Sequence, residues 1–198
     1  HNTTPNAYEL NSLFALMKAE DCDFAVMEIS SHALDQCRVY GLDFEIAVFT
    51  NLTQDHLDYH HTMENYLAAK KRLFRMCRTA VINSDDPYAE EIAAEVNGRV
   101  VTYSTGDNST YSAKGIKYRP ASVDYELVSY EGIRHIRVHT GGRFTVYNSM
   151  AAAVTALEAG ISGEIVADAL DKLPVVKGRA ELVPCDMGFT VIIDYAHT

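Results

Sequence analysis

Apolar positions recur along this chain at helical and at strand-like spacings. Residues 8–20 and 64–77 carry them at helical intervals among polar and charged positions. Short apolar runs at residues 24–29, 45–50, 79–83 and 99–103 are typical of buried strands. Asp85-Asp86-Pro87 predicts the start of a further helix. The first half of the chain therefore alternates strands with helices, which favours a parallel sheet with helices on both faces.

The pattern changes at about residues 110–140, where apolar and polar positions alternate one by one. The run Val123-Asp124-Tyr125-Glu126-Leu127-Val128 shows this period, and Glu131-Gly132 separates it from the next such run. We expect an antiparallel hairpin or meander here, as a smaller sheet beside the parallel one. Helices are expected at about 146–159 and 163–172, and strands at about 180–184 and 189–194. Residues 1–105 and 145–198 are thus predicted to form the parallel α/β part of one domain.

Composition narrows the possible functions. Of 198 residues, 47% are hydrophobic and 22% charged, which is ordinary for a globular protein. The net charge of −10 argues against non-specific binding to nucleic acid or anionic membranes, and no apolar run approaches the length of a membrane helix. The four cysteines form no C-x-x-C pair, which favours a reducing cytoplasm. An anionic ligand is not excluded, because a divalent cation can outweigh the net charge locally.

Polar residues follow four of the predicted strands. They lie in Glu28-Ile29-Ser30-Ser31-His32, in residues 50–56, in Asn83-Ser84-Asp85-Asp86 and in Asp194-Tyr195-Ala196-His197. Because ligands bind outside the carboxyl ends of parallel strands, we expect these segments to converge on a site. Ser30 and Ser31 are expected to be helix caps or hydrogen-bond donors to a ligand, since no G-x-S-x-G elbow surrounds them.

Two interpretations of the acidic and histidine residues stay open at this point. Glu28 lies near the end of an otherwise apolar run, and a buried carboxylate is costly unless it is paired or binds a metal. Glu28 and His56 suit Mg²⁺, with phosphates and water completing the shell. A metal-dependent hydrolase is the alternative, with Glu28, His56, Asp58 and His60 on zinc or manganese. Lys70, judged by its position alone, is a solvated helix lysine.

Four longer segments are more informative about the protein family than these single residues. They are Asn2-Thr3-Thr4-Pro5, residues 27–34, residues 49–60 and residues 194–198, in this order. Together they resemble the Mur ligases of peptidoglycan synthesis, over essentially the whole chain. The resemblance implies the central, P-loop NTPase-like ATPase domain of a three-domain ligase. The N-terminal UDP-binding domain, the phosphate loop and the C-terminal domain are expected to lie outside these residues, so the isolated chain is expected to be inactive.

The resemblance also implies roles for matching positions. Glu28, His56 and Lys70 match a catalytic Mg²⁺ site, in which Lys70 is carbamylated by CO₂. The positions that match contacts to the UDP-N-acetylmuramoyl peptide are Asn2, Thr3, Thr4, Ser30, Gln36 and Arg38. The positions that match nucleotide contacts are Asn51, Asn148, Arg179 and Asp194, with His197 as a further candidate. Two positions depart from the family pattern: Thr145 replaces the usual Asn, and Ala180 a large residue.

The implied reaction is an ATP-dependent ligation. ATP would phosphorylate the terminal carboxylate of UDP-N-acetylmuramoyl-L-alanyl-D-glutamate, and the amino group of a diamino acid would displace the phosphate. Meso-diaminopimelate is favoured over L-lysine, and a cytoplasmic bacterial monomer is expected. Folylpolyglutamate and cyanophycin synthetases share this kind of central domain and remain alternatives, as does a non-catalytic module that holds a nucleotide-sugar.

Overall fold

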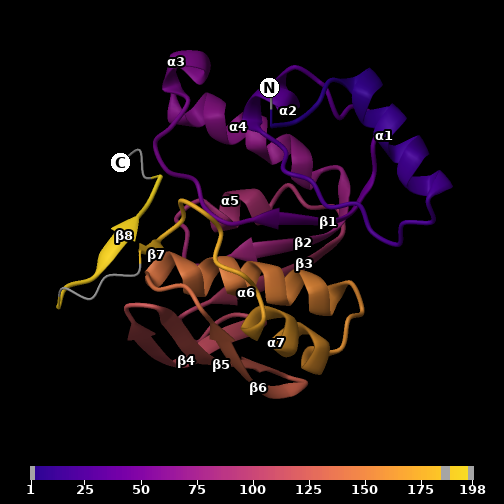
Figure 1. Ribbon diagram of the computed structural model, residues 1–198. Coiled ribbons are helices and arrows are strands. Elements are labelled where there is room, and N and C mark those ends of the chain that lie inside the picture. The colour runs from indigo at the N-terminus through magenta and orange to yellow at the C-terminus, as the bar shows by residue number, and fades with distance from the viewer. Residues whose placement is uncertain (1–2, 184–187, 196–198) are drawn as a thin grey trace.

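The computed structural model describes residues 3–183 and 188–195, which fold around a six-stranded sheet (Figure 1). The strands of this sheet, in spatial order, are β1 (Phe44–Phe49), β2 (Cys77–Asn83), β3 (Arg99–Ser104), β4 (Tyr111–Arg119), β5 (Ser122–Ser129) and β6 (Gly132–Val138). The helices are α1 (Ala7–Ala19), α2 (Ser31–Asp35), α3 (Leu57–His60), α4 (Met63–Phe74), α5 (Ala89–Ala93), α6 (Arg143–Glu158) and α7 (Gly163–Asp171). None of these helices is long and apolar enough to cross a membrane.

The sheet is parallel from β1 to β4 and antiparallel from β4 to β6, which confirms the predicted fold class. The prediction that the alternating region forms a sheet of its own is wrong. β4 pairs with β3 through Tyr103↔Tyr111 and Ser104↔Ser112, so the meander extends the same sheet. A separate two-stranded sheet is formed instead by β7 (Glu181–Val183) and β8 (Val191–Ile193), which pair antiparallel.

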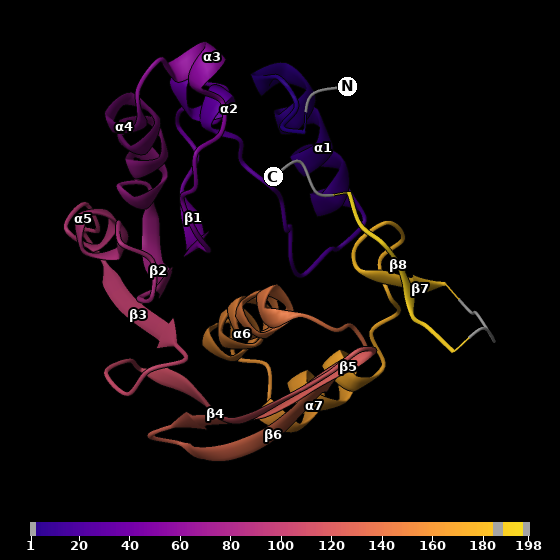
Figure 2. The ribbon, with the colours of Figure 1, turned by 90° about the vertical axis from the view of Figure 1, so that its left-hand side faces the viewer.

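Helices cover both faces of the parallel part, as expected. Ala80 and Ile82 of β2 belong to the buried cluster that α4 and α5 complete, whereas Val81 belongs to the cluster that contains α6. Figure 2 shows α4 and α5 on one side of β1 to β3, and α6 on the other. Because β2 is buried on both faces from residue 80 to residue 82, its sequence there is a continuous apolar run rather than an alternating one.

Side chains fix where the main helices begin. Asn6 and Glu9 form a reciprocal capping box at the start of α1. Thr62 Oγ1 accepts a hydrogen bond from Asn65 N at the start of α4. Helix α4 ends three residues before the predicted boundary at 77, because Cys77 already begins β2 and is buried there.

The prediction of a buried strand at residues 24–29 is wrong. Val26 is 95% exposed and Phe24 61%, and the segment joins no ladder among the described residues. A strand requires a neighbour for its backbone groups, and within the part of the chain that the structure describes, β1 pairs only with β2. The Thr4 hydroxyl holds the segment instead, donating to Glu28 O and accepting from Ser30 N. Glu28 is consequently exposed, not buried as predicted.

Candidate functional site

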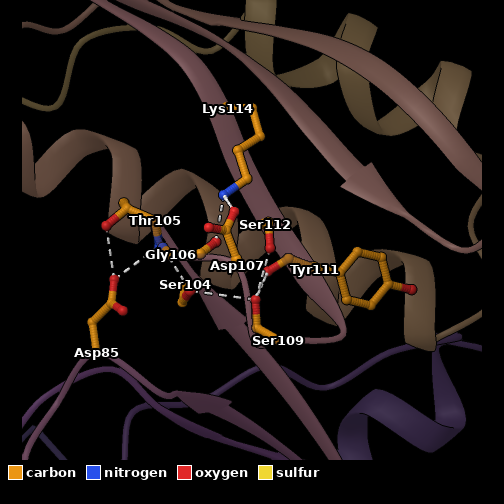
Figure 3. Close-up of polar contacts among 9 residues, drawn as sticks. All are labelled: Asp85, Ser104, Thr105, Gly106, Asp107, Ser109, Tyr111, Ser112 and Lys114. Atoms are coloured by element: carbon orange, nitrogen blue, oxygen red, sulfur yellow. Dashed lines mark hydrogen bonds and ion pairs between the residues drawn. The ribbon is translucent and has the colours of Figure 1, made fainter.

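The carboxyl ends of β1, β2 and β3 are tied together by hydrogen bonds. Asn83 Nδ2 donates to Thr50 O (2.8 Å), and Leu52 N donates to Asp86 Oδ2 (2.9 Å). Asp85 accepts from the backbone and hydroxyl of Thr105 at 2.8 and 2.9 Å, as Figure 3 shows. Of the four segments predicted to converge, those after β1 and β2 do meet. The turn after β3, which was not among the four, joins them through Thr105.

The turn after β3 is fixed by a second group of contacts. Lys114 donates to Gly106 O (2.7 Å) and pairs with Asp107. Ser109 Oγ lies 3.0 Å from Ser112 Oγ and donates to Tyr111 O, so the turn is fastened to the start of β4 (Figure 3). Because this turn also holds Asp85 through Thr105, the rim of the site has a defined shape.

Lys70 lies on α4 at this edge and is partly buried. Burial lowers the pKa of its amine, whereas the nearby carboxylates of Glu28, Asp55 and Asp86 oppose that shift. These carboxylates come from three separate segments, so the fold gathers acidic groups around one lysine. The interpretation of Lys70 as an ordinary solvated lysine is therefore wrong.

His56 and Lys70 both lie near the aromatic ring of Tyr66. The centre of the Tyr66 ring lies 5.3 Å from Lys70 Nζ and 5.9 Å from the His56 ring centre. His56 has a left-handed backbone (φ 54°), an uncommon conformation for a residue with a side chain, and Asp55 Oδ1 accepts from its N–H (2.7 Å). The loop after β1 is thus bent sharply where His56 faces Tyr66.

The donor set around Lys70 fits a hard divalent cation better than zinc. Mg²⁺ is commonly held by one or two protein carboxylates together with phosphate oxygens. Glu28, Asp55 and Asp86 are the carboxylates that lie near Lys70. Within the described residues, no group of three or more His, Cys, Asp or Glu is arranged to hold a metal. His60 is buried and bonded to Ser31 Oγ (2.9 Å), so it does not join His56 as the hydrolase alternative requires.

The structure brings together four residues predicted to contact the UDP-sugar peptide. Thr4 is buried and bonds to Glu28 and Ser30, and Arg38 Nη1 donates to Thr4 O (3.0 Å). Arg38 Nε also donates to Gln36 Oε1 (3.0 Å). Ser30 caps α2 by accepting from Ala33 N, which confirms its prediction as a cap. Thr3 is exposed beside Thr4, and Asn2 lies outside the described residues.

Three of the predicted nucleotide residues line one pocket. Its volume is about 690 Å³, and Asn148, Arg179 and Asp194 all contribute to its wall. The other lining residues are mainly apolar: Val138, Thr140, Phe144, Thr145, Ser149, Ala152, Leu170, Leu173, Pro174 and Val176. A largely apolar cleft with a few polar groups suits a flat heteroaromatic base. Asn51 is exposed in the loop after β1 and does not line this pocket, and His197 lies outside the described residues.

The β7–β8 hairpin places Arg179 beside Asp194. Asp194 Oδ2 accepts from Ala180 N (2.7 Å), and Tyr195 N donates to Gly178 O (2.8 Å). The Arg179 guanidinium lies 5.8 Å from the centre of the Tyr195 ring. Arg179 and Asp194 both line the pocket, so this hairpin supplies a cation and a carboxylate to its wall.

Sequence reasoning missed the structural importance of Tyr66 and Tyr147. The sequence predicts roles for Lys70 and His56 but none for Tyr66, whose ring borders both of them. The Tyr147 hydroxyl donates to Asp85 Oδ2 (2.9 Å), connecting the end of β2 to the helix that carries Asn148. The i, i+4 spacing of Tyr66 and Lys70 was a usable signal, whereas no local pattern indicates the contact between Asp85 and Tyr147.

Comparisons with known proteins agree with this geometry. A family described as the Mur ligase middle domain matches residues 1–156. UDP-N-acetylmuramoyl-L-alanyl-D-glutamate--2,6-diaminopimelate ligase of Bacillus velezensis is 44% identical over 209 residues, covering 100% of this chain and 42% of the relative. The corresponding ligase 1 of Clostridium acetobutylicum is 41% identical over 201 residues, with the same two coverages.

A solved structure of a UDP-N-acetylmuramoyl-L-alanyl-D-glutamate--2,6-diaminopimelate ligase superposes with a TM-score of 0.86 at 35% identity. The match covers 93% of this chain and 39% of that one. The fold and the strand-end site define a Mur-type α/β domain. The chain belongs to the Mur ligase family, and it spans 42% of the length of the two curated relatives above.

Proposed function

We propose that this chain is the central part of an ATP-dependent ligase that adds a diamino acid to UDP-N-acetylmuramoyl-L-alanyl-D-glutamate. Meso-diaminopimelate is the favoured amino acid, because the relatives described above are named for it. The observation that carries the proposal is the position of Lys70 among Glu28, Asp55 and Asp86, at the edge where the strand ends meet.

Two sets of residues would hold the two large substrates. Thr3, Thr4, Ser30, Gln36 and Arg38, with Asn2, would position the UDP-sugar peptide, and Arg38 would attract its carboxylate. Asn148, Arg179 and Asp194 would hold ATP in the apolar pocket, and Asn51 would line the path between the sets. The terminal carboxylate then attacks the γ-phosphorus, which releases ADP and gives an acyl phosphate. The amine attacks the carbonyl carbon, and phosphate leaves.

Lys70 would serve as a carbamate. A partly buried amine with a lowered pKa is neutral more often, and the neutral amine is the form that attacks CO₂. The new N–C bond releases one proton to solvent and converts a cation into an anionic oxygen donor. Glu28, His56 and this carbamate would hold Mg²⁺, which when bound neutralises charge on the transferring phosphoryl group.

We propose further that other parts of the full-length ligase complete the site. The chain has no glycine-rich phosphate-binding loop, and its relatives are more than twice as long. The phosphate loop, a UDP-binding domain and a C-terminal domain for the amino acid would lie in those parts. A cytoplasmic monomer is the proposed form of the enzyme.

The test measures ADP release by the full-length ligase with the UDP-muramoyl dipeptide and each diamino acid. Lys70→Ala should lower kcat by about 10²-fold or more, because a group that stabilises phosphoryl charge is removed. Lys71→Ala is the matched control: Lys71 is the next residue on α4 and pairs with Glu91 and Glu95. It should stay within about twofold of the native rate. ADP release that ignores the dipeptide would contradict the proposal.

A further inference from the structure

His60 joins two sides of the candidate site, and nothing in the proposed chemistry uses it. It is the last residue of α3 and is only 5% exposed. Its ring stacks on Tyr66 with centres 5.1 Å apart and planes 16° apart. Its Nε2 lies 2.9 Å from Ser31 Oγ, on the short helix that Ser30 caps. One buried ring therefore contacts both α4 and α2.

Tyr66 lies between His60 and two groups of the candidate site, Lys70 and His56. Its side chain is buried, and it precedes Lys70 by one turn on the same face of α4. Lys70 Nζ and the His56 ring both approach the Tyr66 ring, at 5.3 Å and 5.9 Å. A shift of the Tyr66 ring would therefore move the surface against which both groups rest.

We propose that His60 is a positioning residue for Lys70 and His56. Its stacked ring fixes Tyr66, Tyr66 places Lys70 and His56, and the bond to Ser31 ties this arrangement to the sugar-peptide side. Burial lowers the pKa of His60, and His32 and His56 add to the effect, while Asp35 and Asp58 oppose it. A neutral ring can stack and form one hydrogen bond without burying a charge.

The proposal rests on the proposed function where it concerns the Lys70 carbamate, so the experiment has two readouts. The 198-residue chain is equilibrated with ¹³C-bicarbonate and Mg²⁺, and the carbamate signal is measured by ¹³C NMR, with Lys70→Ala to assign it. Nuclear Overhauser contacts between the Tyr66 ring and the Lys70 side chain are measured in parallel. Circular dichroism confirms that each variant is folded.

Three variants separate stacking from general damage. His60→Ala should lower the Lys70 carbamate signal about fivefold and abolish the contact between Tyr66 and Lys70, since an aromatic pair is worth roughly this factor. His60→Phe keeps a ring against Tyr66 and should retain most of both signals. His61→Asn changes the exposed neighbouring histidine, where Asn tolerates the left-handed backbone (φ 66°), and should match the native chain.

Each other outcome has a defined meaning. Native-level signals in a folded His60→Ala variant would overturn the positioning role, as would a Phe variant that loses as much as the Ala variant. If the native chain forms no carbamate that Lys70→Ala removes, the carbamate chemistry fails, and the Tyr66–Lys70 contact alone decides the role of His60. Loss of the Tyr66–Lys70 contact in His60→Ala, with retention in His60→Phe, would still support the positioning role. Persistence of that contact in His60→Ala would refute it.

Discussion

Asp85 accepts hydrogen bonds from three groups at the end of the sheet: the N–H and hydroxyl of Thr105 and the hydroxyl of Tyr147. Tyr147 precedes Asn148, which lines the apolar pocket. Asp85 is not among the residues that line the pocket, yet it connects β2, the turn after β3 and α6. At the residue scale, the geometry of the site depends on such connecting side chains as well as on those that would meet a ligand.

This connection predicts a pH-dependent loss of stability in Asp85→Asn. Burial raises the pKa of Asp85, but hydrogen bonds from Thr105, Tyr147 and Ser104 outweigh it and hold the pKa below its ordinary value. The stabilisation is therefore complete above the unfolded-state pKa of about 3.9 and is lost as pH falls through the lower folded-state pKa. We expect a cost of about 1 kcal/mol at neutral pH, because the residue is exposed and the charged hydrogen bonds are partly screened.

Urea unfolding of the native chain and the variant, at neutral and at acid pH, measures this cost. The difference in unfolding free energy should shrink in acid. Glu90→Gln, which removes an exposed carboxylate of α5, is the control and should have little effect at either pH. A cost for Asp85→Asn that stays constant with pH would show that the charge is not its origin.

Helix α6 shows how one element serves two purposes. Val146, Met150 and Val154, spaced four residues apart, are fully buried against the sheet. Phe144, Asn148 and Ala152 have the same spacing and line the pocket. The helix therefore anchors the core along one face and forms the pocket wall along the other.

The two faces of α6 should respond differently to truncation. Met150→Ala should lower the free energy of unfolding by about 2–4 kcal/mol, because it leaves a cavity in the core. Asn148 is exposed, so Asn148→Ala should lower the free energy of unfolding by less than about 0.5 kcal/mol. The same variant should raise the KM for ATP of the full-length ligase about tenfold. Thermal unfolding and initial-rate kinetics measure the two effects. Equal effects of both variants on stability would contradict the division of faces.

The elements were predictable where a local pattern sets burial. Helix α4, helix α6 and strands β1, β2 and β3 follow from apolar spacing, because each buries a contiguous face. The strand prediction for residues 24–29 is wrong because an apolar run indicates a tendency to be buried, and does not indicate that a neighbouring strand is present to accept its hydrogen bonds. The environment of Lys70 was not predictable from spacing, since its carboxylate neighbours come from distant segments; only the family resemblance singled it out.

At the scale of the whole molecule, the chain holds most of the expected contact residues but no glycine-rich phosphate loop. The residues proposed to contact the nucleotide and the sugar-peptide lie on a folded framework, so we expect the isolated chain to fold cooperatively in urea. We also expect it to release no phosphate from ATP above background, with or without the UDP-muramoyl dipeptide. A malachite-green phosphate assay measures this, with the full-length ligase as the positive control. Dipeptide-dependent turnover by the isolated chain would contradict the prediction.

The join between β3 and β4 has a mechanical consequence. Only two residue pairs, Tyr103↔Tyr111 and Ser104↔Ser112, carry the sheet from its parallel to its antiparallel half. Helix α6 crosses this join and packs on strands of both halves, so it holds the two halves of the sheet together (Figure 2). A ligand that binds against the Asn148 face of α6 and stiffens the helix would therefore restrain the join between β3 and β4. Slower amide hydrogen exchange at Tyr111 and Ser112 would then report that the pocket is filled.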